Sequence, residues 1–140
     1  MKNENERCIS PRVLKAYLEK VTGPSFEELG ITSSSAPFLV EINSNEGISL
    51  KGLTEHLMVD KAHTTRVVSK LIDAGLVENK ANGHEYSLYL TEEGRKKAED
   101  ANIIFGEAWK GMLKDLTDAE KETLETILKK ISKVVKEEVQ

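Results

Sequence analysis

The chain has 140 residues, a formal net charge of -4 and a single cysteine. At this length we expect one domain, and a core with an appended dimerisation region also fits. The acidic balance argues against a protein that coats nucleic acid without sequence preference. One cysteine excludes an intrachain disulfide framework and fits a reducing compartment. No apolar run approaches the roughly 20 residues of a membrane span, and the N-terminus lacks the apolar core of a secretory signal, so we expect a cytoplasmic protein.

The first predicted helix begins at Ser10, because serine followed by Pro11 is a favoured helix start. Apolar residues then recur at helical spacing and predict a buried stripe. Gly23-Pro24 is expected to interrupt this helix, since proline removes a backbone donor and clashes with the preceding turn. A second helix is expected to begin within residues 32–35, which offer several possible N-caps.

The central part of the chain predicts a helix-turn-helix. Ser49 and Asp60 are each suited to cap a short amphipathic helix, and a tight turn near Met58 separates the two helices. Gly75 follows the second helix, at a position where a residue in the left-handed conformation commonly ends a helix. This arrangement is typical of proteins that place the second helix in the major groove of DNA.

Two short strands are predicted after this pair of helices, around a polar turn that contains Asn82-Gly83. A helix-turn-helix followed by a hairpin is the layout of a winged helix, in which the hairpin lies beside the recognition helix. We therefore predict a mainly α fold with a small β hairpin. Residues 32–91 would form a winged helix-turn-helix region that binds double-stranded DNA.

The terminal parts of the chain, residues 1–31 and 92–140, are predicted to form a helical dimerisation region. The last helix is expected to be capped by Thr117 or Asp118. It carries apolar residues at near-heptad spacing, namely Leu124, Ile127/Leu128, Ile131 and Val134/Val135. A small winged helix does not need this much additional helix, so we expect the terminal helices to pair with those of a second copy.

The outward face of the second helix of the helix-turn-helix carries the candidate DNA contacts. Arginine is the commonest specific partner of guanine, and the methyl groups of alanine and threonine suit thymine. The candidate base contacts are Ala62, His63, Thr65 and Arg66. The candidate phosphate contacts are Lys61, Ser69, Lys70 and Ser49. The alternative is an ordinary solvated helix face and, for Ser49, a plain N-cap.

In the order of these motifs the chain resembles the MarR family of transcription regulators. The likeness lies in Thr65-Arg66 within the helix-turn-helix, in Gly75-Leu76-Val77 at its end, and in Leu90-Thr91-Glu92-Glu93-Gly94 after the hairpin. It covers nearly the whole chain. The resemblance implies an obligate homodimer that binds a palindromic operator, often as a repressor. It also implies release of DNA when a small aromatic ligand enters a pocket between the dimerisation and DNA-binding regions.

The hairpin tip departs from the family pattern. Members usually carry Asp-x-Arg there, and the arginine enters the minor groove, whereas this chain has Asn82-Gly83-His84 in a shorter hairpin. A narrow minor groove attracts cationic and histidine side chains, so His84 is a candidate contact, with Asn82 beside it. The alternative is a hairpin tip that touches nothing, in which case Lys80 is the better candidate for a phosphate contact.

Other residues have both a functional and a structural interpretation. Tyr17 and Phe38 are candidates for a ligand pocket, although aromatic residues at helical spacing more often form a core. One branch of the family senses peroxides through an N-terminal cysteine, but Cys8 has only Arg7 beside it and we favour an inert thiol. The histidines lack metal-ligand spacing. We expect no metal, no cofactor and no enzymatic activity.

A second function remains open beside DNA binding. Winged helices also serve as protein-interaction modules, because a fold does not determine a function. The acidic balance and the altered hairpin tip favour a module that has lost DNA binding. A lack of salt-dependent binding to any duplex would distinguish this module from a transcription regulator.

Overall fold

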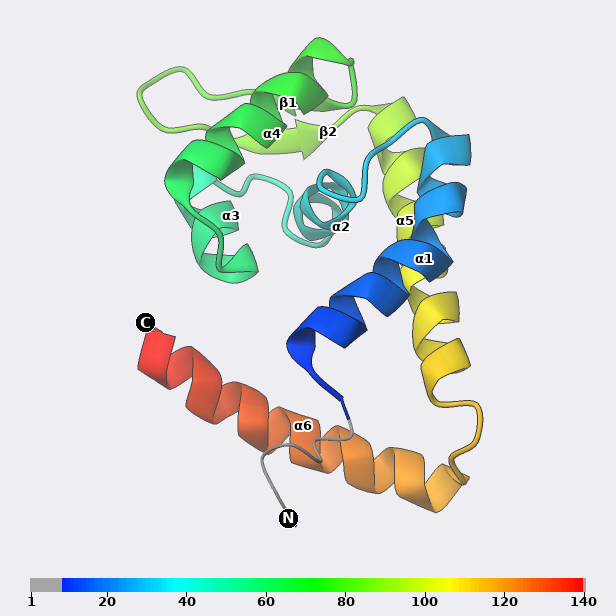
Figure 1. Ribbon diagram of the computed structural model, residues 1–140. Helices are drawn as coiled ribbons and strands as arrows, with labels where there is room; N and C mark the ends of the chain where they lie inside the picture. The colour runs from blue at the N-terminus through cyan, green and yellow to red at the C-terminus, as the bar shows by residue number, and fades with distance from the viewer. Residues whose placement is uncertain (1–8, 140) are drawn as a thin grey trace. The chain divides into compact units, whose positions relative to one another are not determined.

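The computed structural model describes residues 9–139, so Cys8 lies outside the described residues. Over this range the chain forms six helices and two strands, in agreement with the predicted mainly α fold with a small hairpin (Figure 1). In chain order they are α1 (Pro11–Leu29), α2 (Ala36–Ser44), α3 (Leu50–Leu57), α4 (Lys61–Asp73), β1 (Val77–Asn79), β2 (Leu88–Leu90), α5 (Glu92–Met112) and α6 (Asp118–Val139).

The chain divides into two compact units, one that extends to Ala108 and one that begins at Trp109. The first unit contains α1 to α4, the hairpin and most of α5. The second contains the end of α5 and all of α6. Within residues 9–139, no helix has both the length and the apolar character needed to cross a membrane.

Side-chain caps mark the starts of α1, α3, α4 and α6, and they confirm the predicted starts of these helices. Ser10, Ser49 and Asp60 each accept a hydrogen bond from the backbone N–H three residues later, at 3.2, 3.0 and 2.7 Å. At the start of α6, Thr117 accepts from the N–H of Glu120, and the Glu120 carboxylate accepts from the N–H of Thr117. This reciprocal pair is a capping box, and it satisfies two donors that would otherwise lack a partner.

Helix α1 differs from the prediction at Gly23-Pro24, because it continues through both residues and ends only at Leu29, where Gly30 is the C-cap with a φ of 73°. Beyond the proline, Phe26 is 1% exposed, and its ring meets that of Phe105 edge-on with centroids 5.2 Å apart. Burying a large aromatic side chain offsets part of the cost of proline in a helix. The predicted interruption was wrong because local spacing does not reveal this tertiary contact.

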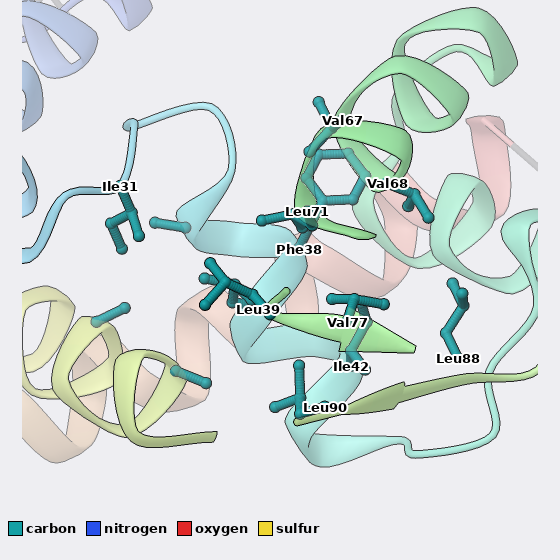
Figure 2. Packing of buried hydrophobic residues seen from close by; sticks show 14 of the residues in the cluster. Ile31, Phe38, Leu39, Ile42, Val67, Val68, Leu71, Val77, Leu88 and Leu90 are labelled. Carbon is teal, nitrogen blue, oxygen red and sulfur yellow. The ribbon is translucent and has the colours of Figure 1, made fainter. Parts of the chain in front are cut away.

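The hydrophobic core of the first unit holds α2, α3 and α4 against the hairpin (Figure 2). Its largest fully buried side chains come from all of these elements and from α1: Phe26, Phe38, Leu39, Ile42, Leu53, Val68, Val77 and Leu88. A close-packed core of this kind resists local deformation. Helix α4 is therefore held in a fixed position relative to the hairpin.

The hairpin is antiparallel, with Val77 opposite Leu90 and Asn79 opposite Leu88. Ile48, just before α3, forms a further bridge to β2, and its carbonyl accepts from the N–H of Leu88 at 3.0 Å. The start of the helix-turn-helix is thereby hydrogen-bonded directly to the hairpin.

The start of α5 lies against the turn that follows α4. Thr91 donates through its N–H to the carbonyl of Leu76 at 3.0 Å and through its hydroxyl to that of Gly75 at 2.8 Å. A side chain at Gly94 would overlap the carbonyl oxygen of Leu76. The Leu-Thr-x-x-Gly motif thus has a structural basis, in which threonine supplies the hydrogen bonds and glycine permits the close approach of two backbones.

Candidate nucleic-acid interface

The turn between α3 and α4 depends on one unusual backbone conformation and one partly buried hydrogen bond. Met58 ends α3 in the left-handed region with φ 55°. The Thr54 hydroxyl donates to the Thr64 hydroxyl at 2.9 Å, and the latter donates to the carbonyl of Asp60 at 3.1 Å. Thr64 is fully buried. This chain of hydrogen bonds joins the two helices and fixes the direction of α4.

Helix α4 has one buried and one exposed face. The buried side chains are Thr64, Val67, Val68 and Leu71. The exposed ones include six predicted DNA contacts: Lys61, Ala62, Thr65, Arg66, Ser69 and Lys70. Side chains three and four residues apart lie on the same side of a helix, so the series at 62, 65, 66 and 69 forms a continuous strip. The structure thus brings these four candidates together on one accessible surface, with Lys61 and Lys70 at its borders. We call this surface, formed by Ala62, Thr65, Arg66 and Ser69, the α4 strip.

His63 is placed differently from the other candidate base contacts. It is half-buried, and its ring meets that of Phe38 edge-on with centroids 5.8 Å apart. Phe38 is 2% exposed and belongs to the core (Figure 2). Phe38, one of the two candidate ligand contacts, is thus part of the core of the first unit. Tyr17, the other candidate ligand contact, is half-buried on α1.

A cavity of about 240 Å³ lies between α4 and the segment that joins α1 to α2. Its polar wall residues are His63, Arg66 and Lys70 from α4 and Thr32, Ser34 and Ser35 from the joining segment. From the sequence alone, the hydroxyl side chains of that segment are predicted only to cap the next helix. Their approach to α4 depends on the tertiary fold. Arg66 and Lys70 therefore belong to both the exposed helix face and the cavity wall.

The hairpin presents a cation at its base rather than at its tip. The Lys80 ammonium nitrogen lies 4.6 Å from the centre of the Tyr89 ring, a cation–π contact across the two strands. The Asn79 side-chain oxygen accepts from the N–H groups of Ala81 and Ser87 and so organises the turn. The predicted contacts at the tip, Asn82 and His84, are exposed.

Ser49 acts as an N-cap, as its hydrogen bond to the N–H of Gly52 shows, and its hydroxyl proton is not used in that bond. His56 pairs with Glu41 at 2.7 Å between Nδ1 and Oε1, which joins α3 to α2. In the part of the chain that the structure describes, no three His, Cys, Asp or Glu side chains lie close enough to hold a metal ion.

Comparison with known proteins agrees with this architecture. Residues 31–82 match the MarR family. The HTH-type transcriptional regulator BilQ of Clostridioides difficile (strain CD3) is 31% identical over 137 residues, covering 94% of this chain and 90% of the relative. A second BilQ, from Clostridium symbiosum (strain WAL-14163), is 30% identical over 107 residues, covering 74% of each chain.

Solved structures show the same relationship. A MarR protein from Peptoclostridium difficile DA00132 has a TM-score of 0.82 at 30% identity, covering 90% of this chain and 84% of that one. A putative MarR family transcriptional regulator from Listeria monocytogenes, in complex with a 26mer DNA, has a TM-score of 0.81 at 26% identity, covering 91% and 87%. These relatives are transcriptional regulators rather than enzymes. The chain belongs to the MarR family of transcriptional regulators.

Proposed function

We propose that the protein is a cytoplasmic repressor that binds a palindromic operator as a homodimer and responds to a small ligand. The observation that carries DNA binding is the α4 strip, because it presents Arg66 between small side chains with Lys61 and Lys70 at its borders. Arginine and small side chains on an exposed recognition helix suit base edges, and lysines suit phosphates. Similarity to the DNA-bound regulator from Listeria monocytogenes supports the same function.

Exposed apolar side chains support the homodimer. They lie on α1, on α5 and along α6: Val13, Val21, Ile103, Trp109, Ile127, Leu128, Ile131, Val134, Val135 and Val139. Exposed apolar side chains that recur along one helix, as they do along α6, are typical of an interface. We assign dimerisation to residues 1–31 and 92–140 and DNA binding to residues 32–91. A two-fold dimer would place its two α4 helices in half-sites about one helical turn apart on the duplex.

The cavity beside α4 supports a response to a ligand. Its volume of about 240 Å³ is sufficient for a small aromatic molecule, since a cavity of about 150 Å³ holds benzene. Val67 and Leu71 provide apolar wall, and Arg66 and Lys70 provide charge. A ligand that engaged these two cations would compete with DNA for them. Binding of ligand and of DNA would therefore be mutually unfavourable, as a repressor released by an inducer requires.

The experiment that tests DNA binding is selection of bound sequences from a random duplex pool, followed by titration of the selected duplex at two salt concentrations. We expect a palindrome to be enriched. Its affinity should fall steeply with salt, because each phosphate contact contributes about −0.9 to the slope of log K against log salt. A ligand response is tested by adding small aromatic compounds to the protein–operator complex and measuring release of the duplex.

The second candidate function is a winged-helix interaction module that binds a protein and not DNA. It is favoured by the net charge of -4 and by a hairpin tip with no lysine or arginine between Lys80 and Thr91. No enrichment and no salt-dependent binding to any duplex would support this module and contradict the proposed regulator.

A further inference from the structure

The Thr65 side chain has its hydroxyl proton engaged within α4. Its Oγ1 donates to the carbonyl of Lys61 at 2.9 Å, while the residue as a whole is exposed. A hydroxyl has one proton to donate and two lone pairs to accept with. Thr65 therefore keeps its methyl group and its acceptor capacity for a partner outside the helix, but no hydrogen-bond donor.

The neighbouring positions leave the first part of the α4 strip largely apolar. Ala62 lies three residues before Thr65 on the same side of the helix, is exposed, and offers only a methyl group. Of the two polar side chains between them, His63 lies against the Phe38 ring and Thr64 is fully buried. The strip thus begins with two methyl-bearing side chains and continues with the guanidinium of Arg66.

In the major groove of DNA, the C5-methyl of thymine is the one apolar group on a base edge, and guanine offers the two acceptors that arginine prefers. We propose that Ala62 and Thr65 contact thymine methyl groups and that each half-site therefore carries thymine beside the guanine bound by Arg66. The inference rests on the proposed DNA binding and adds the sequence chemistry of the half-site. It makes Thr65 a specificity-determining residue through its methyl group.

The competing use of Thr65 is acceptance of a hydrogen bond, by its lone pairs, from the amino group of adenine or cytosine. Two substitutions separate the two uses. Thr65→Ser removes the methyl and keeps the hydroxyl, whereas Thr65→Val keeps a methyl in the same place and removes the hydroxyl. Because Thr65 is exposed, neither change disturbs the core, and circular dichroism verifies that both variants keep their helix content.

The experiment uses the duplex selected by the wild-type chain and versions in which each thymine in turn is replaced by deoxyuridine, which lacks only the C5-methyl. We expect one or two positions per half-site where this replacement lowers wild-type affinity about fourfold, as loss of one buried methyl predicts. Thr65→Ser should show a similar loss on the unmodified duplex and no further loss at one of those positions. Thr65→Val should bind the unmodified duplex more tightly than Thr65→Ser does, and it should keep the sensitivity to deoxyuridine.

Two results would overturn the inference while leaving DNA binding intact. One is salt-dependent binding of the palindrome with equal affinity for every deoxyuridine version. The other is the reverse order of the variants, with Thr65→Val weak and Thr65→Ser unchanged, which would assign Thr65 to hydrogen bonding. Absence of salt-dependent binding to any duplex would instead overturn the proposed function, and the inference with it.

Discussion

Arg66 and Lys70 are one turn apart on α4 and both are exposed, but we expect them to contribute differently to DNA binding. Replacing Arg66 by Ala should weaken specific binding by roughly 1–3 kcal/mol and relax the base preference at one position, because a bidentate contact to guanine is lost. Selection from a random pool with the variant, followed by titration of the wild-type operator, measures both effects. If both the affinity and the site preference are unchanged, Arg66 does not contact a base.

Lys70→Ala is the matched control for this change, since it also removes a cation from α4. A phosphate contact carries no sequence information, so all duplexes should lose affinity to a similar degree. The slope of log K against log salt should become shallower by about 0.9. A sequence-dependent loss would instead assign Lys70 to the bases.

Gly94 is expected to matter for stability because the backbone of Leu76 lies very close to it. A Cβ there would overlap the Leu76 carbonyl, which cannot move without breaking its hydrogen bond from Thr91. We expect Gly94→Ala to lower the free energy of unfolding by about 1–3 kcal/mol, as overpacking does. Gly106→Ala, in the same helix but with open space around it, should be neutral or raise stability by up to about 1 kcal/mol. Urea denaturation at one protein concentration tests both, and equal effects would contradict the steric argument.

At the scale of elements, the orientation of α4 relative to α3 depends on the Thr54–Thr64 hydrogen bond. Thr64→Val should lower the free energy of unfolding by about 1–3 kcal/mol, because it leaves the half-buried Thr54 hydroxyl without its acceptor. The double variant Thr54→Val/Thr64→Val should lose less than the sum of the single changes, since two apolar groups can replace a hydrogen-bonded pair at little cost. Strict additivity in urea denaturation would show that the two hydroxyls act independently.

The same elements show which features the sequence could predict. The caps at Ser49, Asp60 and Thr117 were predictable because each depends on an oxygen and an N–H three residues apart. The continuation of α1 through Pro24 was not, since it coincides with a contact between rings 79 positions apart, Phe26 and Phe105. Local sequence patterns determine where helices begin, whereas long-range packing determines whether a helix continues through an unfavourable residue.

The candidate site shows the same division between local and long-range information. The exposed strip of α4 follows from helical periodicity, and the sequence therefore identified Ala62, Thr65 and Arg66 together. Periodicity placed His63 beside the strip and could not show its contact with Phe38, a residue of another helix. The cation–π contact of Lys80 with Tyr89 likewise requires the strand register. The contacts that join different elements around the candidate interface are thus less predictable than the exposed side chains of α4.

At the scale of the whole molecule, α6 has no buried residue, and Ile131 in its apolar stripe is 53% exposed. If this stripe forms the homodimer interface, Ile131→Gln removes an apolar contact twice, once in each copy. The dimer should then lose about 1.5–3 kcal/mol per substituted side chain. Sedimentation equilibrium over a range of concentrations should show a rise in the dimer dissociation constant.

The matched control for this change is Lys133→Gln, on the opposite side of α6 at 3.6 residues per turn. It should leave the dimer dissociation constant close to that of the wild-type chain.

Operator affinity should follow dimerisation, because a monomer contacts only one half-site. Ile131→Gln should therefore bind the full palindrome weakly at protein concentrations where it is monomeric, and more tightly as the dimer forms. An unchanged dissociation constant for Ile131→Gln would exclude this stripe from the interface. Tight operator binding by a monomeric variant would contradict the coupling of dimerisation to DNA binding.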